Sequence, residues 1–202
     1  MRRGLLWMGL AATLVLALAL VLALQPRRPQ PVRTISSHPA IGGDFDLTSD
    51  LGAKVNQTLL KGKWTAVFFG YTFCPDVCPT TLTALGGAVQ DLSPANAKAF
   101  QVIFITVDPE RDTANVLRRY LSADSFPKGV IGLTGTPSQI TKVAKAYHVY
   151  YQKVPQGGSY VIDHTAVVYL MNPDGAFVAP LDVTKPPADI AREIDDAMAG
   201  QT

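Results

Sequence analysis

Two uninterrupted apolar runs of strand length are the strongest constraint on how this chain can fold. They are Trp64 to Phe69 (WTAVFF) and Val102 to Val107 (VIFITV). A strand that is apolar on both faces has to be covered on both faces, as in a central sheet between layers of helices. Between the runs, apolar residues recur at the three- and four-residue spacing of a helix. These residues are Leu82, Leu85, Val89 and Leu92. We therefore expect an α/β domain.

The other expected elements continue the alternation of strands and helices. A turn at 49–52 joins two short strands into a hairpin at the start of the domain, and Asp112 is expected to cap the helix that follows it. Later elements are a helix from Thr136-Pro137, a strand over Ala166 to Met171 with a hairpin partner at Ala176 to Val178, and a last helix from about Pro187. The predicted order is hairpin, β, α, β, α, short β, α, β-hairpin, α.

The N-terminal region is expected to cross a membrane. Gly4 to Leu24 carries no charged residue and consists mainly of Leu, Ala and Val. As a helix it would be about 30 Å long, which matches the hydrocarbon core of a bilayer. The alternative is a signal peptide cleaved near Ala17 to Ala19, but the apolar part of a signal peptide usually runs only ~7–15 residues. An uncleaved anchor is therefore favoured, and arginines on both sides of it leave its orientation open.

A tether and one folded domain follow the anchor. Residues 25–40 are rich in proline, which predicts a stiff, extended segment. The folded domain is expected to occupy residues 41–202. Several of the basic residues lie before that domain, which is itself mildly acidic. We expect no nucleic-acid partner, because binding to phosphates requires clustered basic residues.

The two cysteines of the chain, Cys74 and Cys78, each precede a proline. The residue before a proline is disfavoured in the α conformation, so we expect neither thiol inside a helix. Pro79 is then the first helical residue and Cys78 the cap. A thiolate at the cap would be stabilised by the N-terminus of the helix.

Two structural explanations compete with a chemical role for these thiols. A disulfide across so short a loop would remove little entropy from the unfolded chain. Burial as two inert core residues fits poorly with the prolines and polar residues beside them. Metal binding or redox chemistry is therefore favoured, although a single CxxxC is only a moderate signal.

A metal site needs a further ligand, and the chain has three histidines. His38 falls in the tether, where it is expected to be solvated, and His148 is expected on a half-buried strand surface. His164 is the best candidate, because it stands between a Gly-Gly loop and the strand that begins at Ala166. Asp163 could orient its imidazole or could simply form a turn.

Two thiolates and one imidazole form a soft set of donors. Such a set suits copper, above all Cu(I), better than Mg²⁺ or Ca²⁺. Zinc normally takes a fourth ligand, and the chain offers no further cysteine. The residues alone therefore favour copper.

The stretches around these residues resemble the Sco/SenC family of copper chaperones, which assemble cytochrome c oxidase. The segment FGYTFCPDVCPTTL is similar to the copper-site loop of that family, and further blocks match in the expected order. The further blocks are IGGDFDLTSDLGAKV, FITVDPERDT, GLTGTPSQI and VIDHTAVVYLMNPDG. The resemblance runs from about Ile41 to the C-terminus, and an anchor followed by a tether also fits the family.

The resemblance implies a thioredoxin-like fold, with Cys74, Cys78 and His164 at the positions of the family's ligands for Cu(I) and Cu(II). It implies a chaperone rather than an enzyme, with the CuA site of cytochrome c oxidase subunit II as its target. A copper donor protein and a thiol reductant would be further partners. It also implies a single-pass inner-membrane protein, with residues 1–3 in the cytoplasm and the domain in the periplasm, or in the intermembrane space of a mitochondrion.

One departure from the family and one block without an assigned role stand beside this resemblance. Phe73 occupies a position where some members have a histidine, so a possible auxiliary ligand is absent. The block Asp108 to Asp112 is a feature of the family. A role in ending the preceding strand and capping the following helix explains this block at least as well as a copper site does.

The rival function is that of a thiol–disulfide oxidoreductase, or a peroxidase, that keeps the CuA-site cysteines reduced. Val77 to Thr80 (VCPT) resembles the loop of a peroxiredoxin. Thioredoxin-type enzymes use CxxC, however, and the spacing here is longer. His164-Thr165 also stands where such enzymes usually have a cis-proline before threonine. A metal ligand at that place favours copper handling as the main role.

Overall fold

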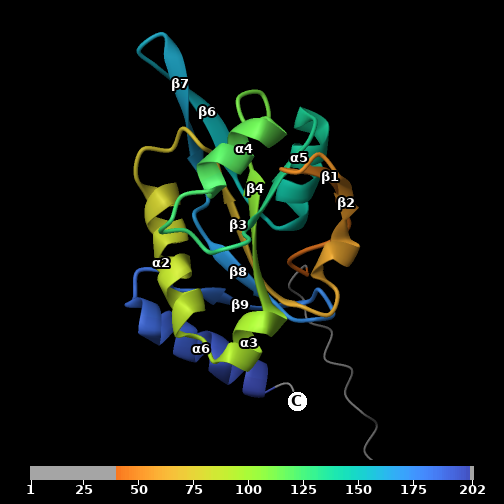
Figure 1. The fold of residues 1–202 in the computed structure, drawn as a ribbon. Helices are drawn as coiled ribbons and strands as arrows, with labels where there is room; N and C mark the ends of the chain where they lie inside the picture. Colours follow the sequence, from red (N-terminus) through yellow and green to blue (C-terminus); the bar gives the residue numbers. More distant parts are fainter. Residues whose placement is uncertain (1–39, 201–202) are drawn as a thin grey trace, which may run out of the picture. The chain divides into compact units, whose positions relative to one another are not determined.

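The computed structural model describes residues 40–200 (Figure 1). A seven-stranded sheet in the order β2-β1-β5-β4-β3-β8-β9 forms its centre, and β6 and β7 pair as a separate two-stranded ribbon. The strands are β1 (Asp46–Ser49), β2 (Lys54–Asn56), β3 (Trp64–Gly70), β4 (Phe100–Thr106), β5 (Ile131–Thr134), β6 (Tyr151–Gln156), β7 (Ser159–His164), β8 (Val168–Met171) and β9 (Phe177–Leu181). The helices are the 3-10 helix η1 (Gln57–Leu60) and α2 (Val77–Asp91), α3 (Pro94–Ala99), α4 (Ala114–Leu121), α5 (Pro137–Ala146) and α6 (Pro187–Ala199).

Aromatic side chains fill the space on both faces of the central strands. Every residue of β3 is buried, and β3 pairs in parallel with β4. Phe68 of β3 packs edge-on against Phe104, whose ring faces Tyr120 of α4. The next residue, Phe69, points to the opposite face and contacts Tyr147 at the end of α5. The prediction of an α/β domain with a sheet covered on both faces is confirmed.

One hairpin is present that the sequence pattern does not predict. The two predicted hairpins, β1 with β2 and β8 with β9, form as expected. In the additional one, β6 and β7 pair around Gly157 and Gly158, whose φ angles of 56° and 81° fit a tight hairpin turn. Strand β6 (YQKVPQ) is almost wholly exposed and contains a proline, so it lacks the apolar alternation that signals a strand. The ribbon projects beyond the central sheet (Figure 1).

Two helix starts differ from the expectation. Ser93 caps the short helix α3, which the predicted order lacks. Asp112 does not cap α4, because Thr113 takes that position and accepts a backbone N–H of the first turn. Asp112 is fully buried instead, where it accepts hydrogen bonds from the hydroxyl groups of Thr72 and Thr106. A buried carboxylate has to be hydrogen-bonded, and these hydroxyl donors meet that need.

None of the helices within residues 40–200 is long and apolar enough to span a bilayer. The expected anchor over residues 4–24 and nearly all of the tether over 25–40 lie outside the described residues. Both therefore stay predictions.

Candidate metal centre

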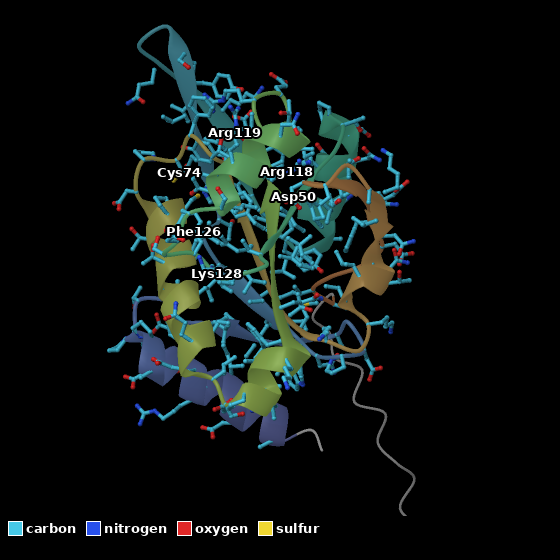
Figure 2. The ribbon with its side chains drawn as sticks, in the orientation of Figure 1. Asp50, Cys74, Arg118, Arg119, Phe126 and Lys128 are labelled. Carbon is cyan, nitrogen blue, oxygen red and sulfur yellow. The ribbon has the colours of Figure 1, made fainter. Side chains whose placement is uncertain are left out.

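The two thiols lie where the chain leaves β3 and enters α2. Cys74 is on the loop (Figure 2), and Cys78 is in the first turn of α2. The expectation that neither thiol lies inside a helix is therefore wrong for Cys78. N–H groups of the first turn have no partner within a helix, so Pro79 loses no hydrogen bond in that position. The first helical bond is donated by Thr80 to the carbonyl of Asp76.

Cys78 is buried against the end of β3, whereas Cys74 is only partly buried. A Cβ atom on Gly70 would lie 2.8 Å from the Cys78 sulfur and 2.8 Å from the ring of Phe104. Only glycine therefore leaves room for the sulfur at the end of β3.

His164 reaches the thiols from the end of β7. Its Nε2 lies 3.7 Å from Sγ of Cys78, and its Nδ1 lies 3.1 Å from the carbonyl oxygen of Thr165. A carbonyl oxygen can only accept, so Nδ1 carries the proton of the neutral imidazole and Nε2 presents its lone pair to the sulfurs. The ring of Tyr71 packs edge-on against the imidazole, with 5.8 Å between the ring centroids.

The ligand atoms of Cys74, Cys78 and His164 all lie within 4.8 Å of one another. Around one ion with bonds of about 2.0–2.3 Å to nitrogen and sulfur, as for zinc, three donors lie up to about 4 Å apart. Small movements of the side chains would therefore bring all three to one ion. The structure brings together the three residues that the sequence predicts as ligands.

Of the two roles left open for Asp163, that of orienting the imidazole is filled by Thr165. Asp163 is exposed, and the imidazole of His164 donates to the Thr165 carbonyl instead. Thr165 is fixed in turn by Tyr150: its N–H donates to the Tyr150 carbonyl over 2.9 Å, and its hydroxyl accepts the Tyr150 N–H over 3.1 Å. Successive residues of a strand point to opposite faces, so Asp163 and His164 do not share a side of β7.

Known proteins resemble this chain in sequence. A family model described as SCO1/SenC matches residues 33–199. This chain belongs to the SCO1/SenC family. The mitochondrial SCO1 homolog 1 of Arabidopsis thaliana is 44% identical over 140 residues, which cover 69% of this chain and 41% of that protein. The mitochondrial SCO1 homolog of Homo sapiens is 32% identical over 198 residues, which cover 93% of this chain and 65% of that protein. The chain thus spans about half the length of these curated relatives.

A solved structure of the family resembles this SCO1/SenC chain as well. ScoI of Bradyrhizobium japonicum, solved with copper bound, is 45% identical and superposes with a TM-score of 0.72. The match covers 78% of this chain and 99% of that one. It confirms the thioredoxin-like α/β fold that the sequence resemblance implies.

The two thiols of this SCO1/SenC protein differ in acidity. The thiol of Cys78 and its backbone N–H donate to the sulfur of Cys74, the N–H over 3.4 Å, and together they lower the pKa of Cys74 to about 5. The contact with Cys74 and burial both raise the pKa of Cys78. Without metal, the site therefore holds one thiolate at neutral pH. It lies on Cys74, and not on Cys78 as expected, because the Cys78 thiol, and to a lesser degree the Cys78 N–H at the start of α2, donate to the Cys74 sulfur.

A cleft of about 420 Å³ opens onto this site between the cysteine loop and the ribbon. Cys74, His164 and Tyr71 line it, with mainly apolar neighbours. Val77, which also lines it, is 46% exposed, and Phe73 beside Cys74 is 61% exposed.

The structure brings no other described histidine to the site. His148 follows α5 in an exposed position with a φ of 55°, so the expected half-buried strand surface is wrong. It ends the helix in a left-handed turn. His38 lies outside the described residues. At Phe73, the ring lies 4.8 Å from the guanidinium of Arg111, a cation–π contact in place of a further ligand.

Sequence reasoning did not identify Tyr71 as part of the site. Its ring is buried against His164, and its hydroxyl accepts the backbone N–H of Ile162 in β7 over 3.3 Å. Tyr71 thereby ties the cysteine loop to the strand that carries the imidazole. A tyrosine just after a buried strand gives only a weak signal, because the strand it contacts is not recognisable in the sequence.

Proposed function

We propose that this protein is a membrane-anchored copper chaperone. Copper is its cargo, which Cys74, Cys78 and His164 bind and which the protein delivers to the CuA site of cytochrome c oxidase subunit II. One observation carries the proposal: a thiolate, a thiol and an imidazole lone pair converge within 4.8 Å beside an open cleft. The copper in the 45% identical ScoI of Bradyrhizobium japonicum supports the choice of ion.

The donors suit both oxidation states of copper. Soft thiolates hold Cu(I), and the imidazole supplies the nitrogen that Cu(II) prefers. Because a thiol must lose its proton to ligate a metal, copper binding releases the proton of Cys78. Because Nδ1 of His164 donates to the Thr165 carbonyl, the neutral imidazole presents its Nε2 lone pair on the side of the sulfurs.

The different burial of the two cysteines suggests an order of ligand exchange. Cys74 lines the cleft, whereas Cys78 is fully buried. A thiolate of the acceptor protein can therefore approach the ion from the cleft and replace Cys74 first. Cys78 and His164 are then the last ligands to leave.

The proposed setting follows from the sequence and the relatives. Residues 4–24 anchor the protein in the inner membrane and residues 25–40 tether the domain on the periplasmic side. The named relatives from Arabidopsis thaliana and Homo sapiens are mitochondrial, which supports the equivalent intermembrane-space side. A copper donor protein and a thiol reductant complete the set of partners.

Copper titration of the full chain in detergent tests the proposal. We expect one Cu(I) per chain under reducing conditions, and X-ray absorption should find two sulfur scatterers and one nitrogen. Cys74→Ser should lose a sulfur scatterer, and oxidation of Cys74 and Cys78 to a disulfide should abolish tight binding. A shell of four sulfurs would instead indicate a thiolate-bridged dimer without His164, and no binding would reject the copper role.

The second candidate function is reduction of the CuA-site cysteines by thiol–disulfide exchange. The lowered pKa of Cys74 favours it, because a thiolate is the attacking species in such exchange. Copper handling and thiol reduction need different residues, since only the former uses His164. Substitution of that residue therefore separates them.

A further inference from the structure

The Asp108 to Asp112 block lies between the two elements that carry the cluster. At one end, Asp112 is fully buried and holds the cysteine loop through Thr72. Its carboxylate accepts the Thr72 hydroxyl over 2.6 Å and the Thr72 N–H over 3.0 Å. A third bond, 2.6 Å from the hydroxyl of Thr106, fixes the carboxylate to the end of β4. Thr72 stands two residues before Cys74, so these bonds set the start of the cysteine loop.

At the other end of the block, Asp108 and Arg111 hold the ribbon through Tyr160. Asp108 is fully buried, pairs with Nε of Arg111 and accepts the Tyr160 hydroxyl over 2.8 Å. Arg111 donates from Nη1 to the Tyr160 carbonyl over 3.0 Å, and its guanidinium lies 3.8 Å from the centroid of the Tyr160 ring. Tyr160 precedes His164 by four residues on the same strand.

Arg111 also faces the cysteine loop. Its guanidinium lies 4.8 Å from the ring centroid of Phe73 and 5.9 Å from that of Tyr71. One planar cation thus contacts aromatic rings of both the loop and the ribbon, which a lysine could not do with the same fork of hydrogen bonds.

The ribbon depends on such contacts for its position. It is not part of the seven-stranded sheet, its strand β6 is almost wholly exposed, and an isolated two-stranded hairpin is only marginally stable in water. We propose that Asp108, Arg111 and Asp112 form a clamp that positions the cysteine loop and the His164 ribbon in register, so that the imidazole meets the two sulfurs. The inference rests on the proposed function in taking Cys74, Cys78 and His164 as the copper ligands, but the docking of the ribbon on the loop can be measured without metal.

The metal-free test uses the contact between the rings of Tyr71 and His164 in the full chain in detergent. Selective labelling of tyrosine and histidine should give a nuclear Overhauser effect between these rings in the natural sequence. Arg111→Gln should lose it, and Tyr160→Phe, which removes only one hydroxyl and is the milder change, should weaken it. A nuclear Overhauser effect between the two rings that keeps its full intensity in both variants would overturn the clamp.

Glu110→Gln is the matched control. Glu110 belongs to the same block and pairs with Lys153 of the ribbon over 2.7 Å, but the two side chains are 59% and 41% exposed, and exposed ion pairs contribute little. This variant should keep the ring contact. Its loss here as well would mean that any change in the block undocks the ribbon, which contradicts a clamp made of three particular residues.

The copper test separates the ribbon side of the clamp, held by Arg111, from the cysteine-loop side, held by Asp112 through Thr72. Arg111→Gln should weaken Cu(II) binding by about 10- to 100-fold, the range for residues that orient ligands, and weaken Cu(I) binding less. Combined with His164→Ala, it should add no further loss, because it acts through that residue. Thr72→Val should weaken binding of both ions, and Thr72→Ser, which keeps the hydroxyl, should restore it. Additive losses in the double variant would overturn the inference.

The two tests also distinguish this inference from the proposed function. A chain that binds no copper but loses the ring contact in Arg111→Gln would refute the copper chaperone and retain the clamp. A chain that binds copper and keeps both the ring contact and its Cu(II) affinity in Arg111→Gln would refute the clamp alone.

Discussion

Sγ of Cys78 lies 3.7 Å from Nε2 of His164, although 86 positions separate the two residues. The contact joins the first turn of α2 to the last residue of β7, so it exists only while the ribbon is docked on the cysteine loop. The two sulfurs alone can form a disulfide, whereas a three-ligand copper site also needs the imidazole. The contact is therefore the feature by which the two candidate functions can be told apart.

His164→Ala should weaken Cu(II) binding strongly and Cu(I) binding less. Loss of a residue that merely supports a ligand already costs about 10- to 100-fold in affinity, and His164 supplies the only nitrogen of the cluster. Cu(I) can still be held by two thiolates. The Cys74–Cys78 disulfide should form and be reduced as before, because only the sulfurs take part in that exchange. Competition titrations with each ion and a redox titration measure both properties.

The same variant tests the physiological role. In a strain that lacks the protein, His164→Ala should fail to restore cytochrome oxidase at limiting copper, and Cys74→Ser should fail too. A stably produced His164→Ala protein that cannot hold Cu(II) yet supports full oxidase assembly would contradict copper delivery and favour thiol reduction.

The reactivity of the reduced, metal-free protein should stay high in mild acid. The pKa of Cys74 is lowered to about 5 by the Cys78 thiol and backbone N–H, so its thiolate persists above that pH and is lost as the pH falls through it. Alkylation by iodoacetamide should be half-maximal near pH 5, whereas an ordinary cysteine, with a pKa of about 8.5, reacts slowly below pH 8. Mass spectrometry after timed alkylation gives the profile. Cys78→Ala should move the midpoint upward, and an unmoved midpoint would show that the Cys78 thiol is not the cause.

Gly86→Ala should destabilise the fold even though it places a better helix former inside α2. A Cβ at this position would lie 2.2 Å from the backbone carbonyl oxygen of Ser125, so α2 or the segment after α4 would have to move. Overpacking costs about 1–3 kcal/mol, and a contact this close with backbone lies at the upper end of that range, above the roughly 1 kcal/mol gained from helix propensity. Urea unfolding provides the free energies. Gln90→Ala, on the exposed side of the same helix, is the control, and its free energy of unfolding should stay within about 0.5 kcal/mol of that of the original protein. A Gly86→Ala protein that is more stable than the original would refute the close approach.

The proposed anchor over residues 4–24 can be tested by the topology of the protein. A reporter enzyme that is active only after export, fused after Thr202, should be active and recovered with the membrane fraction. Activity confined to a cytoplasmic reporter would reverse the orientation. A soluble product that begins near Leu20 would mean that the segment is a cleaved signal peptide.

The sequence by itself determined those features of this protein that depend only on residues close together in the chain. The apolar runs at β3 and β4 predict strands buried on both faces. Consecutive residues of a strand point to opposite faces, so a continuous apolar run makes both faces apolar. Thr136 caps α5 as expected and Pro187 begins α6, because caps and helix-starting prolines act within one turn. The types of the candidate ligands, two thiols and one imidazole, could also be predicted, since donor chemistry belongs to the side chain itself.

Only the tertiary structure decided how those ligands are held. Thr165 rather than Asp163 orients the imidazole, Cys74 rather than Cys78 carries the thiolate, and Asp112 anchors a loop rather than a helix. Each outcome depends on a hydrogen bond whose direction or partner is fixed by packing, and for Asp112 the partner Thr72 lies 40 positions away. Local sequence encodes which groups can donate and accept, but the distance and direction between them follow from the packing of the loop and the ribbon.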